Sequence, residues 1–400
     1  MSVRRVPTRP AARVGGLLLL VGCGTGFAPA PEDPAAAGFD PVALAAAADA
    51  LVAAGSRVVL VRRAGHLALS RYRPDHAPGR VHSGASVAKG IAGLGLALLA
   101  AEGRLSPEDP ASRTVPAWRS DPRRSRITLA QLASHTSGLP NRAEAAWSER
   151  FWARRVDPFS VALRVVPLVA EPGTALHYSS PGFAVLELAM ARTLRGTGTP
   201  DLLLHLRQRV LRRCGIPDEE LYFHYFGPAG RRRDGLRLHG MWGGLSVSGR
   251  ALARLGEILA SPAQARDCAG EAALALAAAM EPASPHALGD AGGPGLLPGF
   301  GFWLNRLGAW PELPCDAAMA YGAGDQLLVV VPSLELVVVR LGAPLPHGAG
   351  RGPVAAGAHV VVPLATALVA PAPGCGAGGT PARVEVGRPT AGLTPGREQP

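Results

Sequence analysis

The residues whose types and spacing point most clearly to chemistry are Ser86 and Lys89. Of the 41 Lys and Arg residues in the chain, Lys89 is the only lysine. An arginine keeps its proton at any working pH, whereas a lysine amine can lose its proton when it is buried. A serine hydroxyl is a weak nucleophile until a neighbouring base removes its proton. A lysine placed three residues after a serine therefore indicates an activated serine nucleophile.

A buried helix is expected to position these two residues. The apolar run 91–101 follows them directly, and residues three apart on a helix lie on one face about one turn apart. The N-terminus of such a helix also favours negative charge on the serine oxygen. The structural alternative is a serine N-cap, followed by a lysine whose stem covers apolar surface.

A second group of polar residues lies in the Pro- and Gly-containing stretch 172–183. It brings Tyr178, Ser179 and Ser180 to the start of the helical run 184–192. A phenol can transfer a proton if a nearby ammonium lowers its pKa, and Lys89 carries the only ammonium side chain. The structural alternative is a helix cap.

A glycine turn, Gly322-Ala323-Gly324, precedes an apolar strand. Glycines permit close approach of the backbone, and a free N–H at this edge could bind a developing oxyanion together with the N–H of Ser86. Trp242-Gly243-Gly244 is a rival for the same role, and an ordinary turn into an edge strand is the structural alternative.

Composition excludes several other classes of function. The chain of 400 residues is 48% hydrophobic and 18% charged, as in globular proteins. Its formal charge of +11 comes from scattered arginines, without a basic stripe interleaved with aromatic residues, so no nucleic-acid partner is expected. An anionic surface in the cell envelope is the preferred reason for this charge. No zinc-ligand spacing, His-Glu-x-x-His motif or Walker A loop is found, so neither metal nor cofactor is expected.

Residues 1–23 indicate an export signal. Four arginines precede a short apolar stretch that ends in Leu20-Val21-Gly22-Cys23. This ending resembles the lipobox of bacterial lipoproteins, in which the cysteine is lipidated. We therefore expect a protein of the bacterial cell envelope, held at a membrane through Cys23. The alternative is an ordinary signal peptide cleaved after Ala30.

The rest of the chain is expected to hold one domain. Residues 24–38 are predicted to be a flexible linker, residues 39–370 the domain, and residues 371–400 a disordered tail. Helices are expected at 41–54 and 353–368, and strands at 57–61, 66–71, 300–304, 326–331 and 334–340, with mostly helical signals between 86 and 260. This order predicts an α+β fold, in which an antiparallel sheet built from both chain termini is flanked by helices and carries an inserted helical lobe. Cys268 with Cys315 is the preferred disulfide.

Four segments together resemble the serine β-lactamase and penicillin-binding-protein superfamily, in particular its class C-like branch of esterases, D-peptidases and 6-aminohexanoate-oligomer hydrolases. Ser86-Val87-Ala88-Lys89 matches the Ser-x-x-Lys box, and residues 127–139 resemble a linking segment typical of that branch. Tyr178-Ser179-Ser180 is similar to the Tyr-x-Asn box. Ala320-Tyr321-Gly322-Ala323 takes the place of the Lys-Thr-Gly strand. The implied fold is the β-lactamase/transpeptidase-like α/β sandwich.

The resemblance also implies roles for individual residues. Ser86 would be the acylated nucleophile, Lys89 and Tyr178 would move its proton, and the N–H groups of Ser86 and Ala323 would form the oxyanion hole. A second set would contact substrate: Ser180, Tyr321, Gly322 and Trp242.

Two departures from the family pattern bear on the substrate. Ser180 replaces the family Asn, and the third box lacks a Lys or His that could hold a substrate carboxylate. Both departures favour a small ester or amide as substrate. A β-lactamase or D,D-peptidase using the same residues, and a non-catalytic envelope binding module with this fold, are the alternatives. The near match of residues 84–88 to a nucleophile elbow keeps an α/β-hydrolase open as well.

Overall fold

The computed structural model describes residues 31–141, 146–153, 155–199, 201–227, 230–283, 295–346, 352–370 and 374–375. Its main element is a seven-stranded sheet in the order β2-β1-β12-β11-β10-β9-β8, in which every neighbouring pair is antiparallel. The strands of this sheet are β1 (Ser56–Arg63), β2 (His66–Tyr72), β8 (Leu297–Pro298), β9 (Trp303–Leu304), β10 (Ala318–Gly322), β11 (Gln326–Val331) and β12 (Leu336–Gly342).

The sheet joins the two ends of the domain, as the sequence predicts. The N-terminal strand β1 pairs with the C-terminal strand β12, so that Leu60 lies opposite Val339. Successive side chains of a strand point to opposite faces. Val58 and Leu60 enter the core on one face, and Val59 and Val61 enter the core on the other. Because helices cover both faces, these antiparallel strands are apolar throughout instead of alternating with polar residues.

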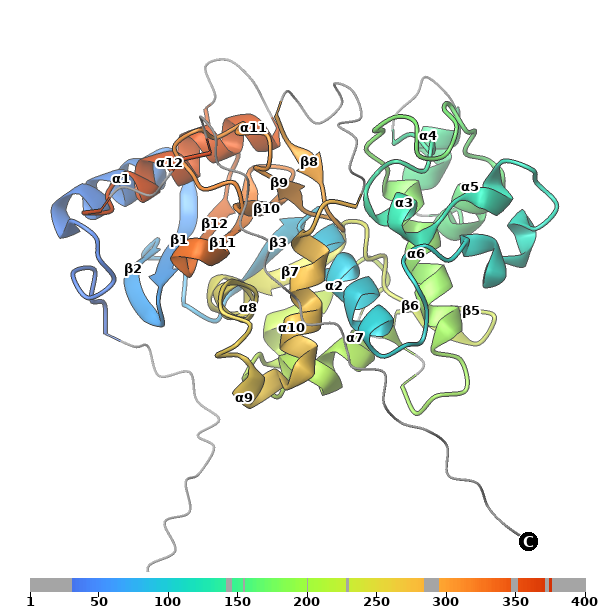
Figure 1. Ribbon diagram of the computed structural model, residues 1–400, viewed down its shortest axis with the longest axis horizontal. Helices are drawn as coiled ribbons and strands as arrows, with labels where there is room; N and C mark the ends of the chain where they lie inside the picture. Colours follow the sequence, from blue (N-terminus) through green and yellow to red (C-terminus); the bar gives the residue numbers. More distant parts are fainter. Residues whose placement is uncertain are drawn as a thin grey trace, which may run out of the picture.

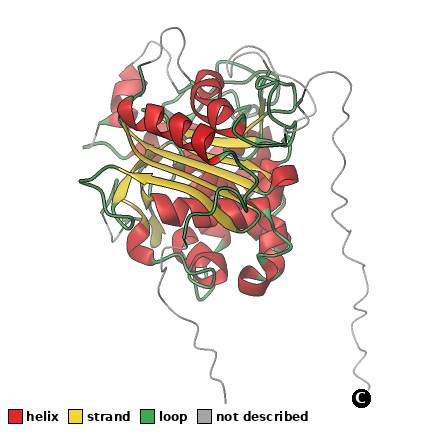
Figure 2. Cartoon of the chain, turned by 90° about the vertical axis from the view of Figure 1, so that its left-hand side faces the viewer, coloured by secondary structure: helices red, strands yellow, loops and turns green. Residues whose placement is uncertain are grey.

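Two helical layers enclose the sheet (Figures 1 and 2). On one face lie α1 (Pro41–Ala53), α11 (Pro353–Ala356) and α12 (Val362–Ala365). The other face is covered by α8 (Gly249–Ala260), α2 (Ala88–Ala101) and α10 (Glu271–Ala277), beyond which the helical lobe extends. The remaining helices are α3 (Leu129–Ala133), α4 (Ala146–Trp152), α5 (Pro158–Arg164), α6 (Ser180–Thr193), α7 (Leu202–Leu206) and α9 (Arg266–Ala269). The α+β architecture with an inserted helical lobe is thus confirmed.

Local sequence signals explain where several elements begin. Asp40 caps α1 by accepting hydrogen bonds from the amides of Val42 and Ala43, and Pro41 stands at the first helical position. Ala64 and Gly65, with φ of 48° and 79°, form the tight turn between β1 and β2. Both features agree with the expected helix and hairpin.

The main omission of the sequence analysis is a set of short strands, of which all but the first lie within the region 86–260 that was expected to be mostly helical. They form a three-stranded sheet in the order β3-β7-β4 and a separate hairpin. The strands are β3 (Val81–Ala85), β4 (Leu221–Phe223), β5 (Arg231–Arg233), β6 (Leu236–Leu238) and β7 (Leu245–Ser248). They are three to five residues long, too short for a reliable alternation of polar and apolar residues.

The expected disulfide between Cys268 and Cys315 is not the one that forms. Cys214 is bonded to Cys268 and Cys315 to Cys375, with Cα–Cα distances of 4.9 and 4.7 Å. Four cysteines allow three pairings, and their spacing along the chain does not distinguish them. The second bond attaches Cys375, which belongs to the segment expected to be a disordered tail, to the body of the domain. There the Cys375 amide also donates to the carbonyl of Leu313.

The linker also ends earlier than expected. Residues 34–38 form a series of turns, Ala37 is buried, and the Asp33 amide donates to the carbonyl of Leu67 in β2. Residues 33–38 therefore pack on the domain. Within the described ranges, no helix is both long enough and apolar enough to cross a membrane. Cys23 and the rest of the expected export signal lie outside those ranges.

Candidate active site

Ser86 lies in the sharp turn that joins β3 to α2. Ala85 has a φ of 45°, in the left-handed region, and the Val87 amide donates to the carbonyl of Gly84. A non-glycine residue in this region is uncommon and stores backbone strain. The turn leaves the Ser86 side chain partly exposed in front of the first turn of α2.

Lys89 occupies the first turn of α2 and is 2% exposed. Its Nζ lies 3.2 Å from Ser86 Oγ and 3.2 Å from Ser180 Oγ, and it donates to the carbonyl oxygen of Trp242. Burial alone lowers the pKa of Lys89 from 10.5 to about 7. The amine is therefore poised to gain or lose a proton near neutral pH.

Three polar partners satisfy Lys89 in both of its protonation states. An ammonium has three N–H donors, which match the two hydroxyls and the carbonyl. A neutral amine has two N–H donors and one lone pair, so it can donate to Ser180 and Trp242 while accepting from the Ser86 hydroxyl. Transfer of the Ser86 proton to Lys89 thus leaves no unpaired polar group, which would be costly in a buried site.

Tyr178 lies next to both Ser86 and Lys89. Nζ of Lys89 lies 4.7 Å from the centroid of the phenol ring. Burial raises the pKa of Tyr178 above its usual value, although a hydrogen bond with Ser86 opposes the shift. The expectation that a lysine ammonium lowers this pKa is wrong, because desolvation of the phenol dominates. Tyr178 therefore keeps its proton and is a hydrogen-bond donor near neutral pH, while Lys89 is the stronger candidate for the base.

His135 supports the loop that carries Tyr178, and the sequence analysis missed it. Its Nδ1 accepts a hydrogen bond of 3.1 Å from the Ser179 amide, and its ring lies 4.5 Å from the ring of Tyr178. Burial and the nearby Lys89 hold the pKa of His135 well below its usual value. A neutral imidazole can accept at Nδ1, so the histidine keeps this hydrogen bond. Its position in the linking segment 127–139 was the only available signal.

Glu187 is a second buried group that the sequence analysis missed. It lies on α6, and its carboxylate accepts hydrogen bonds from the amides of His239, Gly240 and Met241. These three amides directly precede Trp242, whose carbonyl binds Lys89. Glu187 thus fixes the loop that supplies one of the three polar partners of the lysine.

Strand β10 closes the site from the sheet side. A Cβ added to Gly322 would lie 2.4 Å from the Gly84 carbonyl and 3.1 Å from the Ser86 amide. A side chain at this position would therefore collide with the turn that holds the serine. Ala323 follows at the exposed end of the strand. Gly322, at the end of β10, and the amide of Ser86 thus lie close together.

Two residues expected to contact substrate are placed differently. Ser180 is 2% exposed, and its hydroxyl contacts Lys89. Trp242 is 3% exposed, and its ring packs among Phe151, Phe159 and two other aromatic rings. Both residues thus contact the lysine and not an open surface.

Of the other residues expected to contact substrate, Tyr321 is half-buried and donates a hydrogen bond to Asp325. Arg340 lies on β12, which β11 separates from β10 in the sheet. It is 0% exposed and bonds to Ser56 Oγ and three backbone carbonyls. Its guanidinium therefore does not supply the cation that the third box lacks.

The sequence matches the Beta-lactamase family over residues 44–343. The chain belongs to the β-lactamase family. No curated protein sequence matches this family member significantly. Several solved structures share its fold, and they have different activities.

One similar structure is a class C β-lactamase in complex with cefoxitin, at 14% identity and a TM-score of 0.58, covering 82% of this chain and 100% of the other. A family VIII carboxylesterase matches at 16% identity and a TM-score of 0.59, covering 82% and 97%. A D-stereospecific amidohydrolase from Streptomyces sp. matches at 19% identity and a TM-score of 0.53, covering 76% and 94%. The resemblance to the class C-like branch is thereby confirmed. Family and fold together support a serine hydrolase in the broad sense.

Proposed function

We propose that this β-lactamase-family protein is a cofactor-free hydrolase that cleaves a small ester or amide through an acyl-enzyme on Ser86. The observation that carries the proposal is the geometry of Lys89. Its buried amine, with a pKa of about 7, lies 3.2 Å from the hydroxyl oxygen of Ser86, a residue that remains partly exposed. Few structural roles require a lysine to be desolvated beside a reachable hydroxyl.

The reaction follows from the arrangement of these groups. Neutral Lys89 accepts the Ser86 proton while Oγ attacks the substrate carbonyl, and the new C–O bond gives a tetrahedral intermediate. The amides of Ser86 and Ala323 donate to its oxyanion. The proton then passes from Lys89, with Tyr178 as a hydrogen-bonding relay, to the leaving alcohol or amine as its bond to carbon breaks. Water attacks the acyl-enzyme in the same manner and restores the Ser86 hydroxyl.

The surroundings of β10 favour an uncharged substrate. Neither Tyr321 nor Ala323 supplies a cation, and Arg340 has its donors occupied by Ser56 and backbone carbonyls. None of these three residues offers a substrate carboxylate a free charged partner. The carboxylesterase and the amidohydrolase of the same fold are the relatives whose chemistry agrees with this feature.

Covalent labelling tests the proposal. A fluorophosphonate probe should modify the purified protein, and mass spectrometry should place the adduct on Ser86. The Ser86→Ala variant is the matched control and should stay unlabelled. Stable labelling by a fluorescent penicillin would favour a β-lactamase or D,D-peptidase instead. A protein that takes up neither probe and cleaves no 4-nitrophenyl ester would be a binding module.

We further propose that the protein is anchored in the bacterial envelope through Cys23. The motif Leu20-Val21-Gly22-Cys23 supports this location. The Cys23→Ser variant should move from the membrane fraction to the soluble fraction when the full chain is expressed in a bacterial host. Unchanged partitioning would contradict the anchor.

A further inference from the structure

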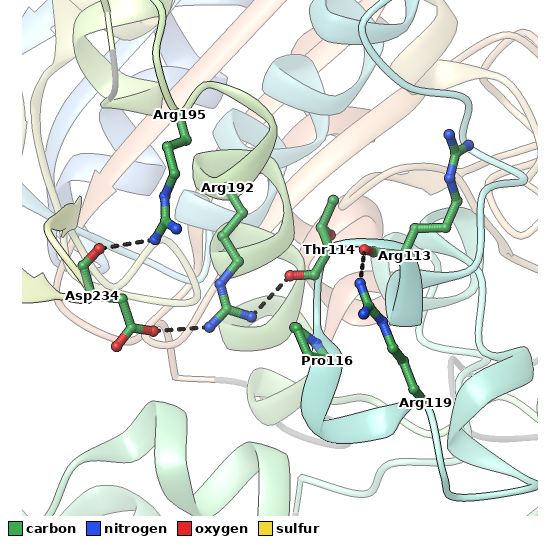
Figure 3. A pocket seen from close by; sticks show the side chains of 7 residues that line it. All are labelled: Arg113, Thr114, Pro116, Arg119, Arg192, Arg195 and Asp234. Carbon is green, nitrogen blue, oxygen red and sulfur yellow. Dashed lines mark hydrogen bonds and ion pairs between the residues drawn. The ribbon is translucent and has the colours of Figure 1, made fainter.

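A second concave site lies in the helical lobe, away from Ser86. It is a surface cavity of about 290 Å³, whose lining includes four arginines and one aspartate. We call it the arginine pocket and define it by Arg119, Arg192, Arg195, Asp234 and Thr114 (Figure 3). Arg192 lies near the C-terminal end of α6, whose first residue is Ser180. At 1.5 Å per residue, the pocket is about 18 Å from the active site along this helix.

Shared partners hold two of the guanidiniums side by side. Arg192 donates to the carboxylate of Asp234 and to the carbonyl of Thr114, both at 2.9 Å. Arg195 donates to the backbone carbonyl of Asp234 at 2.9 Å. Asp234 therefore joins the two arginines, which Figure 3 shows directed toward the same region.

Arg119, which directly follows Trp118, also lines the pocket. It donates to the carbonyls of Ser112 and Arg113 at 3.1 and 3.0 Å, next to the Thr114 carbonyl that binds Arg192. The fourth arginine, Arg113, pairs its own guanidinium with Asp109. No carboxylate within the described ranges pairs with Arg119 or Arg195.

The charges in the pocket do not balance. Besides Arg113, which is ion-paired with Asp109, the lining holds three guanidiniums and one carboxylate, so Arg119, Arg192, Arg195 and Asp234 together carry a net charge of +2. Backbone carbonyls orient the guanidiniums without neutralising them. Each guanidinium has five N–H donors, of which the hydrogen bonds above occupy one or two. Arg119 and Arg195 are also exposed, so their remaining donors are accessible to a ligand.

A purely structural role explains only part of this arrangement. Basic residues at a helix C-terminus compensate the helix dipole, which covers Arg192 and Arg195. Arg119 is the C-cap of the three-residue 3₁₀ turn Pro116–Trp118, in which few peptide dipoles add up, so its charge has little helix dipole to compensate. Its charge therefore adds to those of Arg192 and Arg195 in the lining of the pocket, where a bound anion would offset them.

We propose that the arginine pocket binds the phosphate group of a small anionic ligand. The planar guanidinium matches an oxyanion with two parallel hydrogen bonds, and several guanidiniums together select a multiply charged anion. The cavity is at the small end of the range of ligand pockets, which suits a phosphate with a short organic substituent. Such a group can come from a free phosphorylated compound or from a phospholipid headgroup.

Isothermal titration calorimetry on the purified protein tests the pocket with inorganic phosphate and pyrophosphate at constant ionic strength. The Arg119→Gln and Arg195→Gln variants should each lose about tenfold in affinity, since each removes charge-assisted hydrogen bonds. Asp234→Asn should bind several-fold more tightly, because it removes a competing negative charge. Asp234 has a φ of 50°, which asparagine tolerates well.

Arg213→Gln is the matched control. Arg213 is also exposed and bonded to a backbone carbonyl, that of Cys268, but it lies outside the pocket. Its loss should leave the affinity unchanged, and melting temperatures should show that every variant is folded.

A second arm measures co-sedimentation with phosphatidylglycerol vesicles, with phosphatidylcholine as the neutral reference. If phosphate or pyrophosphate binds more tightly than the phosphatidylglycerol vesicles, the ligand is a free phosphorylated compound. If the vesicles bind more tightly, the ligand is a phospholipid headgroup.

Equal binding by the wild type and the Arg119→Gln/Arg195→Gln double variant in both arms would overturn the proposal. So would the lack of saturable binding of either anion up to about 10 mM together with no preference for the anionic vesicles.

Discussion

The lowered pKa of Lys89 leads to a prediction about the pH dependence of the reaction. A pKa of about 7 means that half of the amine is neutral at pH 7. Below that pH the neutral fraction falls about tenfold per pH unit. The rate of fluorophosphonate labelling of Ser86 should therefore rise with pH, and this rising limb of the pH–rate profile should be centred near pH 7. For an ordinary lysine, the limb would be centred near 10.

Replacing Ser180 moves this limb in a calculable direction. Its Oγ is 3.2 Å from Lys89 Nζ, so a carboxylate in Ser180→Asp would lie about 4 Å from the amine. Two opposite charges at this separation attract by about 4 kcal/mol at an effective dielectric constant of 20, which corresponds to about three pKa units. The limb should move from near 7 toward 10, and labelling at pH 7 should fall between about 100- and 1000-fold.

Ser180→Asn is the matched control, because asparagine has the size of aspartate without its charge. Its limb should stay near 7, whatever its maximal rate. Labelling rates measured from pH 5 to 10, with circular dichroism at each pH, separate loss of charge from loss of fold. Coincident limbs for the Asp and Asn variants, or a wild-type rate independent of pH between 5 and 9, would refute Lys89 as the base.

Three further predictions concern Lys89, Tyr178 and the disulfide of Cys315. Lys89→Arg should reduce ester hydrolysis by at least about 1000-fold while the protein stays folded, because a guanidinium cannot accept the serine proton; comparable turnover by this variant would contradict the mechanism. Tyr178→Phe should reduce the labelling rate by about 10²- to 10⁴-fold with the limb still near pH 7, since the phenol donates and is not the base; a displaced limb would give Tyr178 the role of Lys89. Cys315→Ser should lower the free energy of unfolding in urea by about 2–4 kcal/mol, because it opens the loop closed by the bond to Cys375. An equal loss when Cys315→Ser is compared with the wild type under reducing conditions, in which neither protein has this bond, would show that the effect is not due to the disulfide.

The sequence predicted the parts of the site that depend on local spacing. Ser86 and Lys89 are three residues apart, so any helix beginning there brings them together. The placement of Tyr178 beside them could be predicted only from the resemblance of its box to the family. Its pKa could not be predicted at all, because the pKa depends on how much protein surrounds the phenol.

Contacts between distant segments account for what the sequence analysis missed. In the sequence, Glu187 resembles any polar residue of a helix. Only the folded chain shows that three backbone amides donate hydrogen bonds to it. His135 likewise gains its role from the Ser179 amide, 44 positions later. The strands β3 and β7 stabilise each other across the chain, and neither has a clear strand pattern alone.

The pairing of β1 with β12 has a consequence for how this protein is made. The N-terminal hairpin leaves the ribosome long before Leu336–Gly342 exists, so the hydrogen-bonding edge of β1 stays open throughout most of synthesis. Pairings between such distant segments form slowly, and an open apolar strand invites association with other chains. We therefore expect newly made chains to depend on a chaperone until β12 is complete, and refolding from denaturant to give higher yields at low protein concentration.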